Sequence, residues 1–233
     1  MAPEVPPRPE LVVLDVNETL SDLAPLRDAF ASVGLGEHEV EAWFAGLLRD
    51  AFALTVLGDN PEFADIASAS LQARLSAAGI GVNSSETQQA LAQEVMAQFL
   101  ALRPHPDVVP ALVGLAHSGC RIVTLSNGSS AVARALLEGT EADAVIERYL
   151  SVTDAGAWKP HPSAYAYALS ETGVPAERAM LVAVHPWDLA GARRAGLRTA
   201  WIARGSAAYP GHFPAAEVEA SSMTELADLF AGH

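Results

Sequence analysis

Residues 11–20 read Leu11-Val12-Val13-Leu14-Asp15-Val16-Asn17-Glu18-Thr19-Leu20, and this stretch decides the fold. A short apolar run rich in branched side chains is typical of a strand buried in a parallel sheet, which predicts a strand over about residues 11–16. Asp15 lies at its carboxyl end, where open α/β sheets form their ligand crevice. An aspartate there can be a nucleophile, a metal ligand or the cap of the next helix.

The apolar spacing after this strand changes once along the chain. Helical periodicity predicts helices at 23–33, 37–57, 63–78 and 84–102. After the break at 103–106 we expect helices near 107–118, 129–138 and 187–195, another beginning after Pro162, and a last one at 223–230. Strands are expected at 121–126, 180–184 and 198–203, with a short strand or loop near 148–153.

This alternation predicts an α/β fold, a doubly wound parallel sheet with helices on both faces. The core domain would comprise 11–21 and 104–233, with 22–103 inserted as an α-helical cap domain. Residues 1–10 are rich in proline and are expected to form a flexible lead-in.

Composition narrows the classes of partner. The 233 residues carry 28 acidic and 14 basic side chains, a net charge of −14, which argues against nucleic acids and anionic membranes. No stretch approaches the roughly 20 apolar residues of a membrane span, and Met1 to Glu10 shows no targeting segment. The single cysteine, Cys120, excludes an internal disulfide and reads as a buried, inert thiol. We therefore expect a soluble cytoplasmic protein.

Four polar groups fall at predicted strand ends or helix starts. They are Asp15 with Asn17 and Thr19; Ser126-Asn127-Gly128-Ser129; Lys159-Pro160 ahead of Tyr165; and Trp187-Asp188. In a doubly wound sheet they would converge on one crevice. This set of side chains suits attack by an aspartate on an electrophilic centre, with Lys159 keeping Asp15 ionised.

Each group also has a purely structural explanation. Ser126 and Ser129 could cap a helix, Lys159 could lie on the surface, Trp187 could belong to the core, and Asp188 could favour a helix dipole. The shared order and strand-end placement favour the catalytic interpretation.

The motif order resembles the haloacid dehalogenase superfamily, and within it the type II (S)-2-haloacid dehalogenases. The resemblance implies a Rossmann-like core with a cap. Asp15 would attack the α-carbon of a small 2-substituted carboxylate, forming an aspartyl ester that water hydrolyses. It further implies positioning roles for Thr19, Ser126 and Lys159, support of Lys159 or the hydrolytic water by Tyr165 and Asp188, and a homodimer. The expected substrate-binding residues are Asn17, Phe44, Asn127, His185 and Trp187.

No cofactor and no metal are expected. Magnesium-dependent phosphatases of this superfamily have a second aspartate where this chain has Asn17, and an amide cannot exchange a proton near neutral pH. Residues 183–186 contain no carboxylate, which Mg²⁺ prefers as a ligand. A phosphatase is therefore the less favoured alternative.

Three departures from the dehalogenases leave the leaving group open. The family usually has an aromatic residue at Asn17 and a glycine at Glu18. Its halide-binding arginine is best matched by Phe44, with Arg49 further along that helix. A non-halide substrate is thus an alternative, as in azetidine-2-carboxylate ring opening.

The third departure lies near Asp188, where the family commonly has a serine and an asparagine. This chain has Ala183 and His185. His185 could be a structural loop histidine, a substrate contact or the base for the ester-hydrolysing water.

Overall fold

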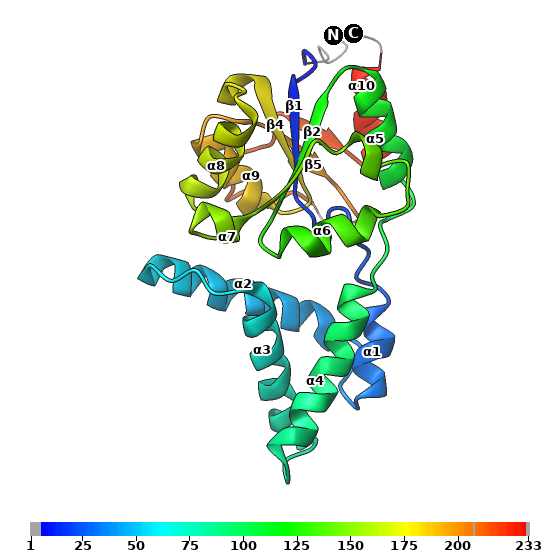
Figure 1. Cartoon of the computed structure of the whole chain (residues 1–233), viewed down its shortest axis with the longest axis vertical. Helices are drawn as coiled ribbons and strands as arrows, with labels where there is room; N and C mark the ends of the chain where they lie inside the picture. Colours follow the sequence, from blue (N-terminus) through cyan, green and yellow to red (C-terminus); the bar gives the residue numbers. More distant parts are fainter. Residues whose placement is uncertain (1–5, 207, 232–233) are drawn as a thin grey trace. The chain divides into compact units, whose positions relative to one another are not determined.

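The computed structural model describes residues 6–206 and 208–231. The chain divides into two compact units (Figure 1). The core unit runs to Ser21 and resumes at Pro104, and the helical unit spans Asp22–Arg103. The predicted flexible lead-in, 1–10, falls partly outside the described residues. Within the described part, Glu10 pairs its backbone with Arg178 and Arg121.

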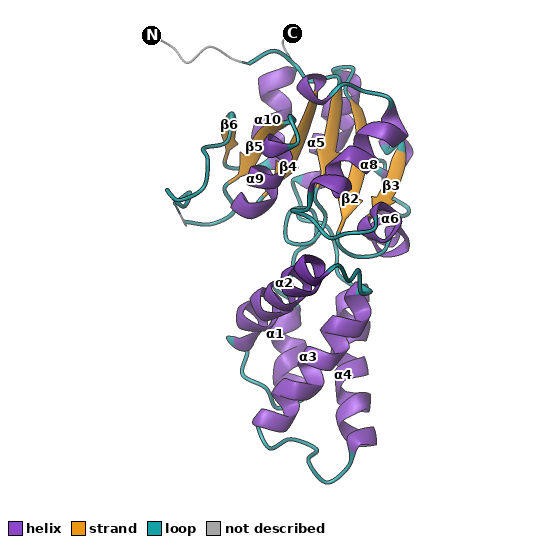
Figure 2. Cartoon of the chain, turned by 90° about the vertical axis from the view of Figure 1, so that its left-hand side faces the viewer, coloured by secondary structure: helices purple, strands orange, loops and turns teal. Residues whose placement is uncertain are grey.

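The described residues of the core unit form a six-stranded parallel sheet, in the order β3-β2-β1-β4-β5-β6 (Figure 2). The strands are β1 (Leu11–Leu14), β2 (Arg121–Ser126), β3 (Arg148–Ser151), β4 (Ala179–Ala183), β5 (Arg198–Ile202) and β6 (Val218–Ala220). This is the strand order of a doubly wound nucleotide-binding-type sheet, as the alternating pattern predicts. Because β1 pairs with β2 on one side and β4 on the other, the ends of these three strands are neighbours.

Helices cover both faces of this sheet. They are α5 (Val108–His117), α6 (Ser130–Leu137), α7 (Val152–Ala155), α8 (Pro162–Thr172), α9 (Pro186–Arg194) and α10 (Met223–Phe230), with 3₁₀ turns η1 (Asp143–Val145) and η2 (Ala176–Arg178). Helices α5 and α10 lie on one side and α8 and α9 on the other (Figure 1). All four residues of β1 are fully buried, as expected for a strand covered twice.

The helical unit contains α1 (Leu26–Ser32), α2 (Glu39–Leu57), α3 (Phe63–Ala77) and α4 (Ser85–Leu100). Aromatic rings from all four helices form its interior. Trp43 lies 5.6 Å from Phe30 and 6.2 Å from Phe99 between ring centroids, and Phe63 stacks on Phe99 at 5.2 Å. These contacts bury the apolar residues whose 3- and 4-residue spacing predicts the helices.

Most predicted elements appear within a few residues of their expected bounds, and the differences are local. Of the expected segment 148–153, Arg148–Ser151 form strand β3 and the next residues begin α7, where Ser151 caps the new helix by accepting a hydrogen bond from Thr153 N–H. Strand β6 was not predicted, since three residues are too few to establish a period. In the described part of the chain, none of the helices has the length and apolarity needed to cross a membrane.

Candidate active site

The candidate site lies at the carboxyl ends of β1, β2 and β4. Asp15 follows β1, and its backbone N–H still donates to Val182 of β4. The carboxylate of Asp15 is held on both oxygens: Lys159 Nζ donates to Oδ1 at 2.8 Å, and Thr19 Oγ1 donates to Oδ2 at 2.6 Å. Thr19 Oγ1 itself accepts from Val184 N–H at 3.0 Å, which fixes its proton toward Asp15. Three segments distant in sequence thus orient one carboxylate.

Lys159 lies between two carboxylates. Its Nζ donates to Asp188 Oδ2 at 2.7 Å as well as to Asp15, and its side chain is fully buried. The other oxygen of Asp188 accepts from the hydroxyl of Tyr165 at 2.6 Å. The surface interpretation is therefore wrong for Lys159, because its side chain is fully buried. Asp188 lies in the first turn of α9, as the helix-dipole interpretation expects, and it also belongs to this network.

The electrostatics of the network keep Asp15 ionised. Burial alone would raise the pKa of Asp15, but Lys159 and His185 hold it well below its ordinary value. Burial would lower the pKa of Lys159, and the two carboxylates instead raise it. Burial raises the pKa of Asp188, and Lys159 offsets this only in part. Asp15 is thus a buried carboxylate whose lowered pKa favours the ionised form, which is the state a nucleophile requires.

His185 joins Asp15 to a residue outside the predicted site. Its Nδ1 lies 3.0 Å from Asp15 Oδ2, and its Nε2 lies 2.8 Å from Glu18 Oε2. Burial would lower the pKa of His185, but these two carboxylates raise it to about 9. The ring of Trp187 lies beside it, 4.9 Å away between centroids. His185 is therefore an imidazolium in contact with Asp15 at neutral pH.

Glu18 has an unusual backbone. Its φ is 62°, the left-handed region, which costs a residue with a side chain roughly 1–2 kcal/mol. The loop holds this conformation through Ser21, whose Oγ accepts from Glu18 N–H, and through the contact of His105 Nε2 with the Glu18 carbonyl. The sequence signal for Glu18 was its replacement of the glycine that the family favours, although its link to His185 is a tertiary feature.

The segment Ser126-Asn127-Gly128-Ser129 holds the backbone of Lys159 and stabilises the turn that follows β2. Asn127 Oδ1 accepts from Lys159 N–H at 2.9 Å, and its amide donates to the Lys159 carbonyl at 3.4 Å. Among the described residues, Ser126 Oγ accepts from Gly128 N–H at 2.9 Å rather than contacting Asp15. Ser129 caps α6 by accepting from Val132 N–H, so its structural interpretation is correct. Asn127 therefore positions the backbone that carries Lys159.

The remaining predicted residues are placed separately. Asn17 is nearly buried in the loop after Asp15. Phe44 belongs to the helical unit, where its ring lies 6.2 Å from Trp43 and 6.4 Å from Phe63. Arg49 pairs with its neighbour Asp50 and is 76% exposed. Phe44 as a substrate contact stays a prediction.

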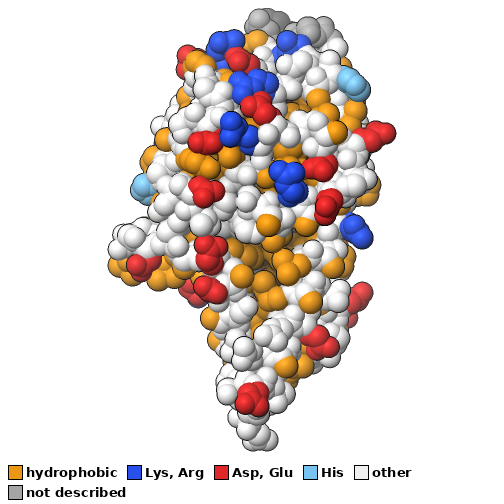
Figure 3. Space-filling view, in the orientation of Figure 1, with side chains coloured by type: hydrophobic (Ala, Val, Ile, Leu, Met, Phe, Trp, Pro, Cys, Tyr) orange, Lys and Arg blue, Asp and Glu red, His pale blue; other side chains and the backbone are white. Residues whose placement is uncertain are grey.

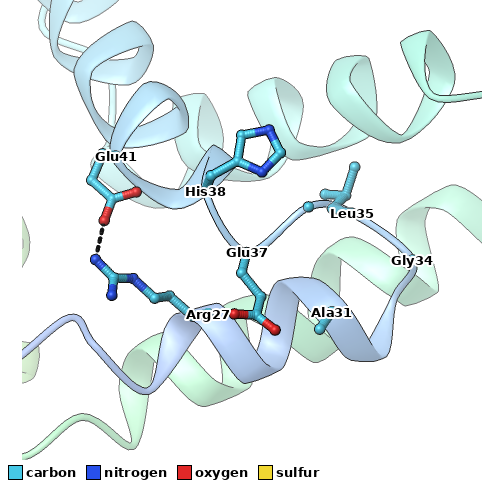
Figure 4. Close-up of a pocket in the computed structure, with 8 residues that line it drawn as sticks. Arg27, Ala31, Gly34, Leu35, Glu37, His38 and Glu41 are labelled. Carbon is cyan, nitrogen blue, oxygen red and sulfur yellow. Dashed lines mark hydrogen bonds and ion pairs between the residues drawn. The ribbon is translucent and has the colours of Figure 1, made fainter.

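A cavity in the helical unit and one charged face differ in kind from these residues. A cavity of about 690 Å³ in the helical unit is lined by Arg27, Glu37, His38 and Glu41, and Arg27 is paired with Glu41 at 2.5 Å (Figure 4). It holds none of the residues predicted to react. On the face drawn in Figure 3, Lys and Arg side chains are interspersed with Asp and Glu, so this face offers no broad basic surface for a phosphate backbone.

The donor set does not fit the Mg²⁺ ion of the related phosphatases. Hard cations need free carboxylate oxygens. Here the oxygens of Asp15 face Lys159, Thr19 and His185, and those of Asp188 face Lys159 and Tyr165. Two of these partners, Lys159 and His185, are cations, which would repel a metal ion.

Comparisons with known proteins agree with this architecture. The family model of haloacid dehalogenase-like hydrolases matches residues 9–196. An (S)-2-haloacid dehalogenase of Pseudomonas putida is 26% identical over 222 residues, 94% of each chain. A phosphoglycolate phosphatase of Rhodospirillum rubrum is 31% identical over 185 residues, 78% of this chain and 68% of that one.

Solved structures show the same fold. The L-2-haloacid dehalogenase of Xanthobacter autotrophicus superposes with a TM-score of 0.83 at 23% identity, covering 96% of this chain and 98% of that one. The family match spans most of the chain and contains every motif of the site. This chain therefore belongs to the haloacid dehalogenase-like hydrolases.

Proposed function

We propose that this hydrolase acts without a metal on a small 2-substituted carboxylate, using Asp15 as a nucleophile at the α-carbon. The observation that carries the proposal is the ionised, buried carboxylate of Asp15, oriented by Lys159 and Thr19. Asn17 supports it, because an amide cannot supply the proton that phosphate-ester cleavage needs at that position. The dehalogenase relative supports the substrate class.

The reaction would proceed in two steps. An oxygen of Asp15 forms a bond to the α-carbon, and the leaving group departs with the bonding electron pair. Water then attacks Cγ of the resulting ester, the acyl–oxygen bond breaks, and a 2-hydroxy acid leaves while Asp15 is regenerated. With a halide as leaving group, the products are the hydroxy acid, one halide and one proton.

The other predicted residues have roles that follow from their contacts. Lys159 and Thr19 orient Asp15, while Tyr165 and Asp188 hold Lys159. Asn127 fixes the backbone of Lys159. We further propose that Ser126, Asn17 and Trp187 line the substrate pocket. Ser126 Oγ accepts a backbone hydrogen bond, which leaves its own proton available for a substrate carboxylate.

Two alternatives keep specific support. Phe44 at the position expected for a halide-binding arginine favours a non-halide leaving group, including the amine of a strained ring. The phosphatase relative, at 31% identity, favours phosphate esters. The crowding of Asp15 and Asp188 by proton donors makes the phosphatase the weaker of the two.

One assay set separates these functions. Halide release is measured with both enantiomers of 2-chloropropionate, ring opening with azetidine-2-carboxylate, and phosphate release with a generic ester, each with and without EDTA. Turnover of a carbon substrate that EDTA leaves unchanged and Asp15→Asn abolishes supports the proposal. Single turnover in ¹⁸O-water should label Asp15 first. Activity restricted to phosphate esters and dependent on Mg²⁺ would refute it.

A further inference from the structure

His185 and Glu18 form a pair that the two-step mechanism has so far not used. His185 Nδ1 contacts the reacting carboxylate, and its Nε2 contacts Glu18 Oε2. The histidine side chain is 13% exposed, whereas that of Glu18 is 37% exposed. The pair therefore reaches from the nucleophile toward solvent.

The backbone conformation of Glu18 indicates a functional role for its side-chain carboxylate. A residue other than glycine is held in the left-handed backbone conformation, which glycine adopts without strain. Backbone strain of this kind persists where the surrounding structure requires it, often at reactive sites. Glu18 differs from glycine here by a side chain whose carboxylate hydrogen-bonds to His185.

The contact with Glu18 also determines which nitrogen of His185 keeps its proton. A neutral imidazole retains one N–H, and the carboxylate beside Nε2 favours that proton on Nε2. The lone pair of Nδ1 then faces the carboxyl group of Asp15. This arrangement is that of the acid–histidine pairs that activate water or hydroxyl groups elsewhere.

The charge of Asp15 controls whether Nδ1 of His185 carries a proton or a free lone pair. While Asp15 is ionised, His185 faces two carboxylates and keeps both protons. Esterification removes the charge of Asp15, while the carboxylate of Glu18 stays in contact with His185. Lys159 contacts both Asp15 and Asp188, and His105 Nε2 contacts the Glu18 carbonyl.

We propose that Glu18 and His185 act as a base that is switched on by formation of the Asp15 ester. The inference rests on the proposed function, since it assigns the water-activating group of the same reaction. Asp188 is less suited to this role, because its oxygens already accept hydrogen bonds from Lys159 and Tyr165.

The proton balance closes over the cycle. On ester formation His185 loses its Nδ1 proton, which passes to solvent, and the ring becomes neutral with its remaining proton on Nε2. Nδ1 then takes a proton from the water that attacks Cγ, and returns it to the departing alkoxide of the product. The regenerated carboxyl group of Asp15 passes its new proton to His185. One proton is released per turnover, as the overall reaction requires.

The charge coupling can be measured without a substrate. Asp15→Asn replaces the carboxylate with a neutral group, as esterification does. We expect ¹⁵N NMR titration of His185, assigned with His185→Asn, to give a pKa near 9 in the parent. In Asp15→Asn it should fall by about one unit or more, a tenfold loss of proton affinity.

Asp188→Asn is the matched control, because it removes a buried carboxylate whose oxygens accept hydrogen bonds from Lys159 and Tyr165. It should shift the His185 pKa by much less than Asp15→Asn does. Asp15→Ala provides the same readout if the amide variant does not fold. A His185 pKa that is unchanged in both Asp15 variants would overturn the inference while leaving the proposed function standing.

The base role is tested with whichever carbon substrate the assays identify. In single turnover, Glu18→Gln and His185→Asn should slow hydrolysis of the ester roughly 10²-fold or more, so that its mass accumulates on the Asp15 peptide. His117→Asn, far along the chain in α5, should turn over normally. Equal slowing of ester formation and ester hydrolysis would reduce the pair to a positioning role and refute the proposal. Failure to form any Asp15 ester would instead refute the proposed function.

Discussion

Replacing Lys159 with methionine tests the electrostatic account of the site. Lys159 Nζ contacts Asp15 and Asp188 at 2.8 and 2.7 Å, and the three side chains are 0%, 5% and 0% exposed. Methionine retains most of the apolar volume and removes the cation. Two buried carboxylates then lose the charge that compensates them.

The expected cost is large because the partners stay buried. Removing one member of a buried ion pair typically destabilises a protein by about 3–5 kcal/mol, since the remaining charge lacks both water and its partner. Asp15 keeps His185 as a cation, so most of the penalty falls on Asp188, which retains the hydroxyl of Tyr165. We expect Lys159→Met to lower the free energy of unfolding by an amount in this range at pH 7.

The pH dependence has a definite sign. Burial already raises the pKa of Asp188, and loss of Lys159 raises it further above its unfolded value. A carboxyl group with a raised folded pKa gains stability as the pH falls, because protonation removes the buried charge. Asp15 in the parent behaves oppositely: its depressed pKa stabilises the fold fully above about pH 3.8 and is lost only below that.

Urea denaturation of parent and Lys159→Met at pH 7 and pH 5 checks both points. The difference in free energy of unfolding between the parent and Lys159→Met should be smaller at pH 5 than at pH 7 by about 1 kcal/mol or more. Arg121→Met is the control: its ion pair with Glu147 is about one-third exposed, so its loss should cost less than about 1 kcal/mol at either pH. A gap that is small at pH 7, or that widens at pH 5, would refute the account.

Four further substitutions probe packing and protonation, and the effect of each on the free energy of unfolding is measured by urea denaturation. Gly191→Ala should lower the free energy of unfolding by about 1–3 kcal/mol, because the new Cβ would lie 2.5 Å from Tyr165 Oη. Gly114→Ala is its control: the new Cβ would lie 3.6 Å from its nearest neighbour, so this variant should gain about 0.5–1 kcal/mol of stability. Tyr165→Phe should cost about 1–3 kcal/mol through the lost donor to buried Asp188; parental stability would contradict this. The raised pKa of His185 stabilises the fold fully below about pH 6.5, and this contribution is lost as the pH rises through 9. The parent should therefore lose roughly 2–3 kcal/mol relative to His185→Asn between about pH 6 and pH 10.

Local pattern was enough to predict the sheet and its strand-end residues. The run Leu11–Leu14 and the turns after β2 and β4 are recognisable because apolar periodicity and burial are coupled within a few residues. Helix α10, predicted at 223–230, has these bounds because Ser222 caps it and its apolar face is regular. Irregular or very short segments, such as α7 and β6, have too little repetition for this reasoning.

The sequence by itself determined which chemical groups stand at the strand ends, including Asn17 in place of a second acid. Only the tertiary structure decided which of them touch. Lys159 lies 144 positions from Asp15, and His185 lies 167 positions from Glu18. The physical reason is that contacts and protonation states depend on distances set by strand order and loop closure, which no local pattern encodes. For that reason Asp15 could be proposed as a nucleophile and His185 as a candidate contact or base from the sequence, whereas the contacts of His185 with Asp15 and Glu18 and the strained backbone of Glu18 became visible only once the chain was folded.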